Sequence, residues 1–263
     1  MPARATVATF MFHEVTDDPT ASGFQRPGAM AYKHTPEAFA RCLDGIGAEA
    51  MPPALVTEVD LAHPGRHVLL TFDDGGKSAL TAAAELERRG WRGQFFIVTS
   101  LIGSRGFLDA AEIRALRHAG HLIGSHSHTH PNIFREQSVA RMHEEWRTSA
   151  DVLSQLLGEP CLAGSVPGGD ISRTVLDSAA QVGLRHLFTS EPWLTPRPVA
   201  NCWVLGRFSV KTGTSPAQVR DLARFRGWTG ALIRRRLKVL ATRTLPPLYR
   251  LYIRARTGKR RGA

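Results

Sequence analysis

Two stretches, VLLTFDDG at residues 68–75 and LIGSHSHTH at residues 122–130, each join a short apolar run to side chains that can bind a metal. The apolar runs predict buried strands, so Asp73, Asp74 and the histidines fall at the C-terminal ends of strands. One carboxylate and two imidazoles form a three-ligand set for a catalytic divalent metal, and the second carboxylate is then available as a base. Either stretch alone also fits a solvated turn, but the occurrence of both argues against coincidence.

Predicted strands and helices alternate along the first 226 residues. The strands are expected at residues 6–12, 68–72, 94–99, 121–125, 161–166, 186–189 and 202–208, and helices are expected to start near residues 35, 78, 109, 138, 173 and 216. Two helix starts carry capping signals, namely Thr35 followed by Pro36, and Asp109 with Glu112. The alternation predicts an α/β fold whose parallel sheet or barrel has its site at the C-terminal strand ends.

Together, TFDDG at 71–75 and HSHTHP at 126–131 resemble the first two motifs of the polysaccharide deacetylase family, also described as NodB-homology or carbohydrate esterase family 4-like proteins. The resemblance covers roughly residues 6–208. It implies an irregular, NodB-like (β/α) barrel of about seven strands. It also implies metal-dependent hydrolysis of an N-acyl group, usually the acetamide of N-acetylglucosamine.

The resemblance further implies a role for each residue of the two motifs. Asp73 matches the general base, and Asp74, His126 and His130 match the metal ligands, commonly of zinc. General chemistry supports this division, because a metal with three protein ligands lowers the pKa of water to about 7 and polarises an amide carbonyl. His128, between the two histidine ligands, is expected to lie outside the ligand set.

The third family motif, which has an arginine, a proline, an aromatic residue and a glycine, is altered in this chain. The matching stretch is SVPGG at 165–169, so Ser165 replaces the arginine that would orient the base, and Gly168 replaces the aromatic residue. The Gly168 amide is a candidate oxyanion donor, and Gly169 is a candidate substrate contact. A tight turn without a catalytic role is an equally good interpretation.

Two later segments also depart from the family pattern. Trp193, in TSEPW at 189–193, either lines a sugar-binding cleft or belongs to the core. The segment LGRF at 205–208 lies where the family supplies a histidine general acid, and it contains no histidine. His13, at the end of the first predicted strand, is the candidate substitute acid, with a structural histidine as the alternative.

The composition is typical of a soluble globular protein, with 43% hydrophobic and 22% charged residues among 263. The three cysteines form no CxxC pair, which argues against a disulfide framework and favours a reduced, cytoplasmic setting. The first residues do not resemble a signal peptide, and no stretch approaches the roughly 18 apolar residues of a membrane span.

Residues 228–263 hold the whole excess of positive charge. They contain eleven Lys or Arg and no acidic residue, whereas residues 1–227 contain 23 residues of each sign. Basic and apolar residues are interleaved, and Pro246 and Pro247 divide the segment into two predicted short helices. We expect a basic amphipathic extension that attaches peripherally to an anionic inner membrane face, or else a helix that closes the barrel. The neutral body argues against a nucleic-acid partner.

The sequence therefore predicts a deacetylase-like barrel at residues 1–227 and a basic extension at residues 228–263. The leading hypothesis is a hydrolase with a divalent metal, most commonly zinc, that removes an N-acetyl group from an N-acetylated sugar or glycan precursor. Two alternatives stay open. One is an amidase for a non-sugar acyl amide, and the other is a barrel that binds carbohydrate without turnover.

Overall fold

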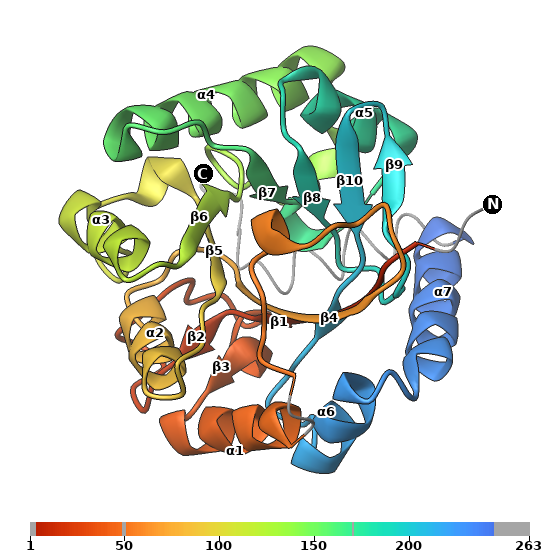
Figure 1. The fold of residues 1–263 in the computed structure, drawn as a ribbon. Coiled ribbons are helices and arrows are strands. Elements are labelled where there is room, and N and C mark those ends of the chain that lie inside the picture. Colours follow the sequence, from red (N-terminus) through yellow and green to blue (C-terminus); the bar gives the residue numbers. More distant parts are fainter. Residues whose placement is uncertain (1–3, 49–50, 170, 245–263) are drawn as a thin grey trace.

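The structure is a computed structural model that describes residues 4–48, 51–169 and 171–244, with only the backbone described for 238–244. Its main element is a curled nine-stranded sheet in which adjacent strands are parallel except for the last pair (Figure 1). In spatial order the strands are β11 (Phe208–Ser209), β1 (Thr6–Phe12), β4 (Arg66–Phe72), β5 (Gln94–Ile97), β6 (Leu122–Ser125), β7 (Ala163–Ser165), β8 (His186–Phe188), β10 (Cys202–Leu205) and β9 (Arg197–Val199). Strands β2 (Glu14–Val15) and β3 (Lys33–His34) form a separate parallel pair.

The row of seven parallel strands from β1 to β10 confirms the predicted α/β barrel. The expectation of one strand at 202–208 is wrong, because this segment forms two short strands. The first, β10, pairs with β8, and the second, β11, pairs with β1, so the segment joins the two ends of the seven-strand row. The break falls where the Arg207 amide donates to the Glu191 carbonyl oxygen at 2.9 Å. At Gly206, a Cβ would lie 2.5 Å from that same oxygen.

Seven helices of the described chain surround this sheet (Figure 1). They are α1 (Pro36–Gly47), α2 (Ala79–Glu87), α3 (Ala110–His118), α4 (Val139–Leu157), α5 (Arg173–Gln181), α6 (Pro216–Ala223) and α7 (Trp228–Thr244). Five short 3-10 helices are η1 (Met30–Tyr32), η2 (Val56–Glu58), η3 (Thr99–Leu101), η4 (Phe134–Glu136) and η5 (Pro167–Gly169). Thr35 caps α1, and Asp109 and Glu112 form a capping box on α3, so both predicted helix starts are confirmed.

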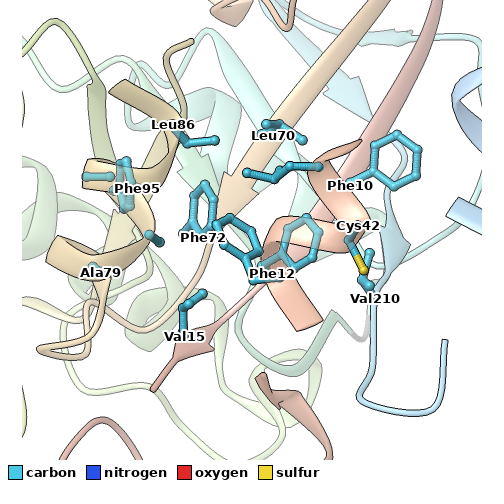
Figure 2. Close-up of a cluster of buried hydrophobic side chains, with 14 of the residues drawn as sticks. Phe10, Phe12, Val15, Cys42, Leu70, Phe72, Ala79, Leu86, Phe95 and Val210 are labelled. Atoms are coloured by element: carbon cyan, nitrogen blue, oxygen red, sulfur yellow. The ribbon is translucent and has the colours of Figure 1, made fainter. Parts of the chain in front are cut away.

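Both faces of the central strands are buried. Phe12, Phe72 and Phe95 form a stacked row, with ring centroids 5.8 and 4.6 Å apart, that packs with residues of α1 and α2 (Figure 2). Leu69 and Phe96 belong to a second buried cluster on the other face of the same strands. This two-sided burial explains why the strands are continuous apolar runs in the sequence.

Helix α7 begins in the core. The Trp228 side chain packs with Phe10 at a ring separation of 6.2 Å, and its Nε1 donates to the Leu222 carbonyl oxygen at 2.9 Å. The first turn of α7 therefore packs as part of the barrel, while the division at residue 227 stays a prediction. Pro246 and Pro247, which define the second predicted tail helix, lie outside the described residues. Within the described ranges, every helix is too short or too polar to cross a membrane.

Candidate functional site

The candidate site lies at the C-terminal ends of β4 and β6, which both pair with β5. Asp73 and Asp74 directly follow β4, and the stretch from His126 to His130 follows β6. The φ angles of Asp74, Ser127 and His130 are 77°, 62° and 52°, a region that residues other than glycine rarely adopt. Strained backbone of this kind costs about 1–3 kcal/mol per residue and clusters at functional sites.

Asp74, His126 and His130 bring three ligand atoms together. Asp74 Oδ1 lies 3.4 Å from His126 Nε2 and 3.7 Å from His130 Nε2, and the three ligand atoms all lie within 4.8 Å of one another. Ligands that share one ion at about 2.1 Å must be this close to each other. The structure therefore assembles the three predicted ligands in an arrangement that fits a divalent metal. The set itself does not select one first-row ion.

A hydrogen bond fixes the orientation of the His126 ring. Its Nδ1 lies 3.0 Å from the Ser165 carbonyl oxygen, which only accepts, so Nδ1 carries a proton and Nε2 is the ring atom that faces Asp74. His128 behaves differently, because its Nδ1 lies 2.9 Å from Thr99 Oγ1 and its side chain is not part of the converging set.

Asp73, the predicted base, is held by Arg207. The Nη1 and Nη2 atoms of Arg207 donate to Oδ1 and Oδ2 of Asp73 at 2.7 and 2.8 Å, and the two side chains are 0% and 3% exposed. The remaining Arg207 donors bind Thr71 Oγ1, Ser165 Oγ and the Thr189 carbonyl oxygen. All five guanidinium N–H groups therefore have an acceptor. Ser165 Oγ also donates to Asp73 Oδ1 at 3.0 Å.

Arg207 is the functional residue that sequence reasoning missed. Ser165 occupies the place of the family arginine, and the structure supplies an arginine from the break between β10 and β11 instead. Burial raises the pKa of Asp73, but the charges of Arg207 and His126 outweigh burial and hold this pKa below its usual value. Asp73 is therefore ionised at pH 7. The sequence did carry a signal, because Arg207 lies inside the apolar run at residues 202–208. A charged side chain in such a run needs a buried partner of opposite charge.

The loop after β7 presents two glycines with positive φ, 65° at Gly168 and 67° at Gly169. The Gly169 amide donates to the Val166 carbonyl oxygen at 3.1 Å, which leaves the Gly168 amide as the candidate oxyanion donor. A Cβ at Gly169 would lie 2.0 Å from Ser190 Oγ, so this packing requires glycine.

His13 follows β1 and lies near the two carboxylates. Burial lowers its pKa more than Asp74 and Asp73 raise it, so the imidazole is neutral at pH 7. Its ring packs on Tyr32 at a centroid distance of 4.5 Å. Its Nδ1 is buried and has no hydrogen-bond partner within the described part of the chain.

Trp193 lies on the loop after β8 and is half-buried. The Arg197 guanidinium lies 3.9 Å from the centroid of its ring, so one face of the indole is covered. The same loop contains Glu191, whose carbonyl oxygen accepts from the Arg207 amide and whose side chain binds Arg235 of α7 at 2.8 Å. The loop therefore supports the arginine that holds Asp73.

Residues 60–187 match the model of the family described as polysaccharide deacetylase. The peptidoglycan-N-acetylglucosamine deacetylase PgdA of Listeria monocytogenes is 26% identical over 183 residues, which are 68% of this chain and 38% of that protein. The chain thus spans well under half the length of this relative.

Solved structures show the same fold at low identity. A polysaccharide deacetylase from Bacillus cereus aligns with a TM-score of 0.71 and 17% identity, over 84% of this chain and 69% of that one. The Streptococcus pyogenes deacetylase PplD, in complex with acetate, aligns with a TM-score of 0.69 and 18% identity, over 85% of this chain and 99% of that one. IcaB from Ammonifex degensii aligns with a TM-score of 0.69 and 20% identity, over 85% of this chain and 98% of that one.

Proposed function

Because this chain belongs to the polysaccharide deacetylase family, we propose that it is a metal-dependent hydrolase that removes the acetyl group from an N-acetylated sugar or glycan precursor. The observation that carries the proposal is the convergence of Asp74, His126 and His130 beside an ionised Asp73. The Listeria relative is named as a deacetylase of N-acetylglucosamine in peptidoglycan. This name supports N-acetylglucosamine as the reacting unit of the substrate.

In this proposal Asp74, His126 and His130 hold a divalent ion, with zinc as the proposed metal. Such an ion supplies Lewis acidity, which polarises an amide carbonyl and lowers the pKa of water to about 7. Asp73 accepts the proton of the attacking water, because Arg207 keeps its carboxylate ionised and fixed in orientation.

Two groups of the chain complete the reaction. The Gly168 amide donates to the acyl oxygen as negative charge develops there. The leaving nitrogen needs a proton, and we assign its delivery to Asp73, which has just accepted one. His13 is neutral and then contacts the substrate by a hydrogen bond. If His13→Gln lowers kcat more than 100-fold with metal content unchanged, His13 and not Asp73 delivers the proton to the leaving nitrogen.

The test compares wild type with Asp73→Asn after zinc loading. We expect one metal per chain in both proteins, and acetate release from N-acetylglucosamine oligomers that falls about 10²- to 10⁴-fold in the variant. His126→Ala is the control that loses the metal. Metal binding without acetate from any acetylated glycan would favour the amidase or the binding protein, and a wild type that binds no metal would refute the proposal.

We also propose that the C-terminal segment attaches the enzyme to an anionic membrane surface, on the cytoplasmic side that the cysteine pattern favours. Ile233 and Leu237, one turn apart on α7, are 53% and 62% exposed. Each Lys or Arg near an anionic leaflet contributes about 1 kcal/mol. The full chain should sediment with vesicles containing phosphatidylserine and not with neutral ones, and a chain ending at Thr244 should sediment less. Sedimentation that is equal for both chains, or absent, would contradict this.

A further inference from the structure

Phe24 and Arg26, on the loop between β2 and η1, lie beside the metal-ligand set. The Phe24 ring is 5.1 Å from the ring of the ligand His130, and the Arg26 guanidinium carbon is 4.9 Å from the Phe24 centroid. Both side chains are half-buried. One aromatic ring therefore lies between a fixed cation and the imidazole of His130.

The charge of Arg26 is held in place without being neutralised. Its Nη1 donates to Asn132 Oδ1 at 2.8 Å, which is a neutral acceptor. Among the described residues, no carboxylate lies within 4.0 Å of this guanidinium, and none of their ion pairs includes Arg26.

We propose that Arg26 receives an anionic group, a carboxylate or a phosphate, that the substrate carries next to its N-acetylated sugar. This inference rests on the proposed function and names the class of substrate. A guanidinium offers a planar fork of donors that matches both anions, and the stacked Phe24 keeps that fork oriented. With the acetamide at the ligand set, a sugar ring lies over Phe24, and a substituent on that sugar or the next one reaches Arg26.

A second cation lies over an aromatic ring that packs on His13. Lys211 Nζ lies 5.3 Å from the centroid of Tyr32, and Tyr32 packs on His13. Within the centre itself, Asp73 is paired with Arg207. Because Asp73 is already engaged by Arg207, the two cation–aromatic pairs favour an anionic over a neutral ligand.

The experiment compares kcat/KM for acetate release from three disaccharides. These are neutral di-N-acetylchitobiose, its 1-phosphate, and N-acetylglucosaminyl-N-acetylmuramic acid, which carries a carboxylate. We expect wild type to prefer at least one anionic disaccharide by about tenfold, the size of one charged hydrogen-bonded pair. Arg26→Gln should lose most of this preference, and Arg26→Lys should retain part of it. The phosphate and carboxylate arms identify which anion is recognised.

Arg114→Gln, on the outer helix α3, is the control with the same change in net charge. It should keep the wild-type preference. A wild type without preference, or an Arg26→Gln protein that keeps it, would overturn the inference while leaving the deacetylase proposal intact. If no disaccharide is hydrolysed, the dissociation constants of the three compounds for zinc-loaded Asp73→Asn, with and without Arg26→Gln, decide the inference separately.

Discussion

At the scale of single residues, Asp73 and Arg207 act as one unit. The carboxylate receives two parallel hydrogen bonds from the guanidinium and a third from Ser165 Oγ. Both charges are buried, so each depends on the other, and removing one partner from a buried pair costs about 3–5 kcal/mol. The pair fixes the direction of the carboxylate as well as its ionisation. In the proposed mechanism, its orientation toward the ligand set determines how well Asp73 accepts a proton.

Arg207→Lys tests this pairing. Lysine keeps the charge but loses the two-point contact, so we expect kcat/KM for acetate release to fall about 100-fold while the metal stays bound. Ser165→Ala removes one hydrogen bond from Asp73 and should cost about tenfold or less. Metal content and melting temperature are measured alongside the kinetics. Wild-type activity in Arg207→Lys would show that the paired geometry is not needed.

At the scale of elements, α7 supports the site from outside the sheet. Arg235 Nε donates to Glu191 Oε1 at 2.8 Å, and its Nη2 donates to the Gly169 carbonyl oxygen at 3.0 Å. The Arg235 and Glu191 side chains are only 17% and 12% exposed. One helix thus contacts both the loop with the Gly168 amide and the loop whose backbone binds Arg207. Helix α7 therefore holds two loops that lie beside the candidate site.

We expect Arg235→Ala to lower kcat about tenfold with a smaller change in KM, because both loops lose a shared anchor. Arg235→Lys should recover part of the loss, which a general loss of stability would not explain. Arg220→Ala, on the exposed surface of α6, is the matched control and should leave kcat within twofold. Steady-state kinetics on the four proteins check this, and equal kcat values for Arg235→Ala and wild type would rule out the positioning role.

At the scale of the whole molecule, several histidines are buried in neutral form. Burial is the largest influence on His34, His121 and His186, and it lowers the pKa of each, to about 4 for His186. In the unfolded chain these groups titrate near 6.5. Between these values the unfolded state binds more protons than the folded state, so the free energy of unfolding falls as the pH drops below about 6.5.

Urea unfolding at pH 7.5, 6.5 and 5.5 should therefore show a progressive loss of stability toward acid. His186→Gln removes one contributor, so its stability should depend less steeply on pH than that of wild type. His118→Gln, at an exposed position, should keep the wild-type slope. All proteins are compared at the same metal content, because the proposed metal ligands also take up protons. An unchanged slope in His186→Gln would contradict the assignment.

Much of the fold and the candidate ligand set could be predicted because the signals are local. Apart from residues 202–208, each predicted strand region forms a single strand, and the capping residues Thr35 and Asp109 begin their helices as expected. Asp74, His126 and His130 each lie just after a strand, and parallel strands bring their C-terminal ends to one edge. Periodicity, caps and motif spacing therefore sufficed for the barrel and for the residues that converge at its edge.

Tertiary structure alone decided which groups support these residues. Asp73 and Arg207 are 134 positions apart, and they meet only because β10 and β11 pair with opposite ends of the strand row. Arg26 and Arg235 also bind partners far away in the sequence, Asn132 at 106 positions and Gly169 at 66 positions. Local sequence sets the conformation of a segment and the chemistry of its side chains. The partners of buried or charged side chains follow from strand order and barrel closure, which depend on interactions across the whole chain.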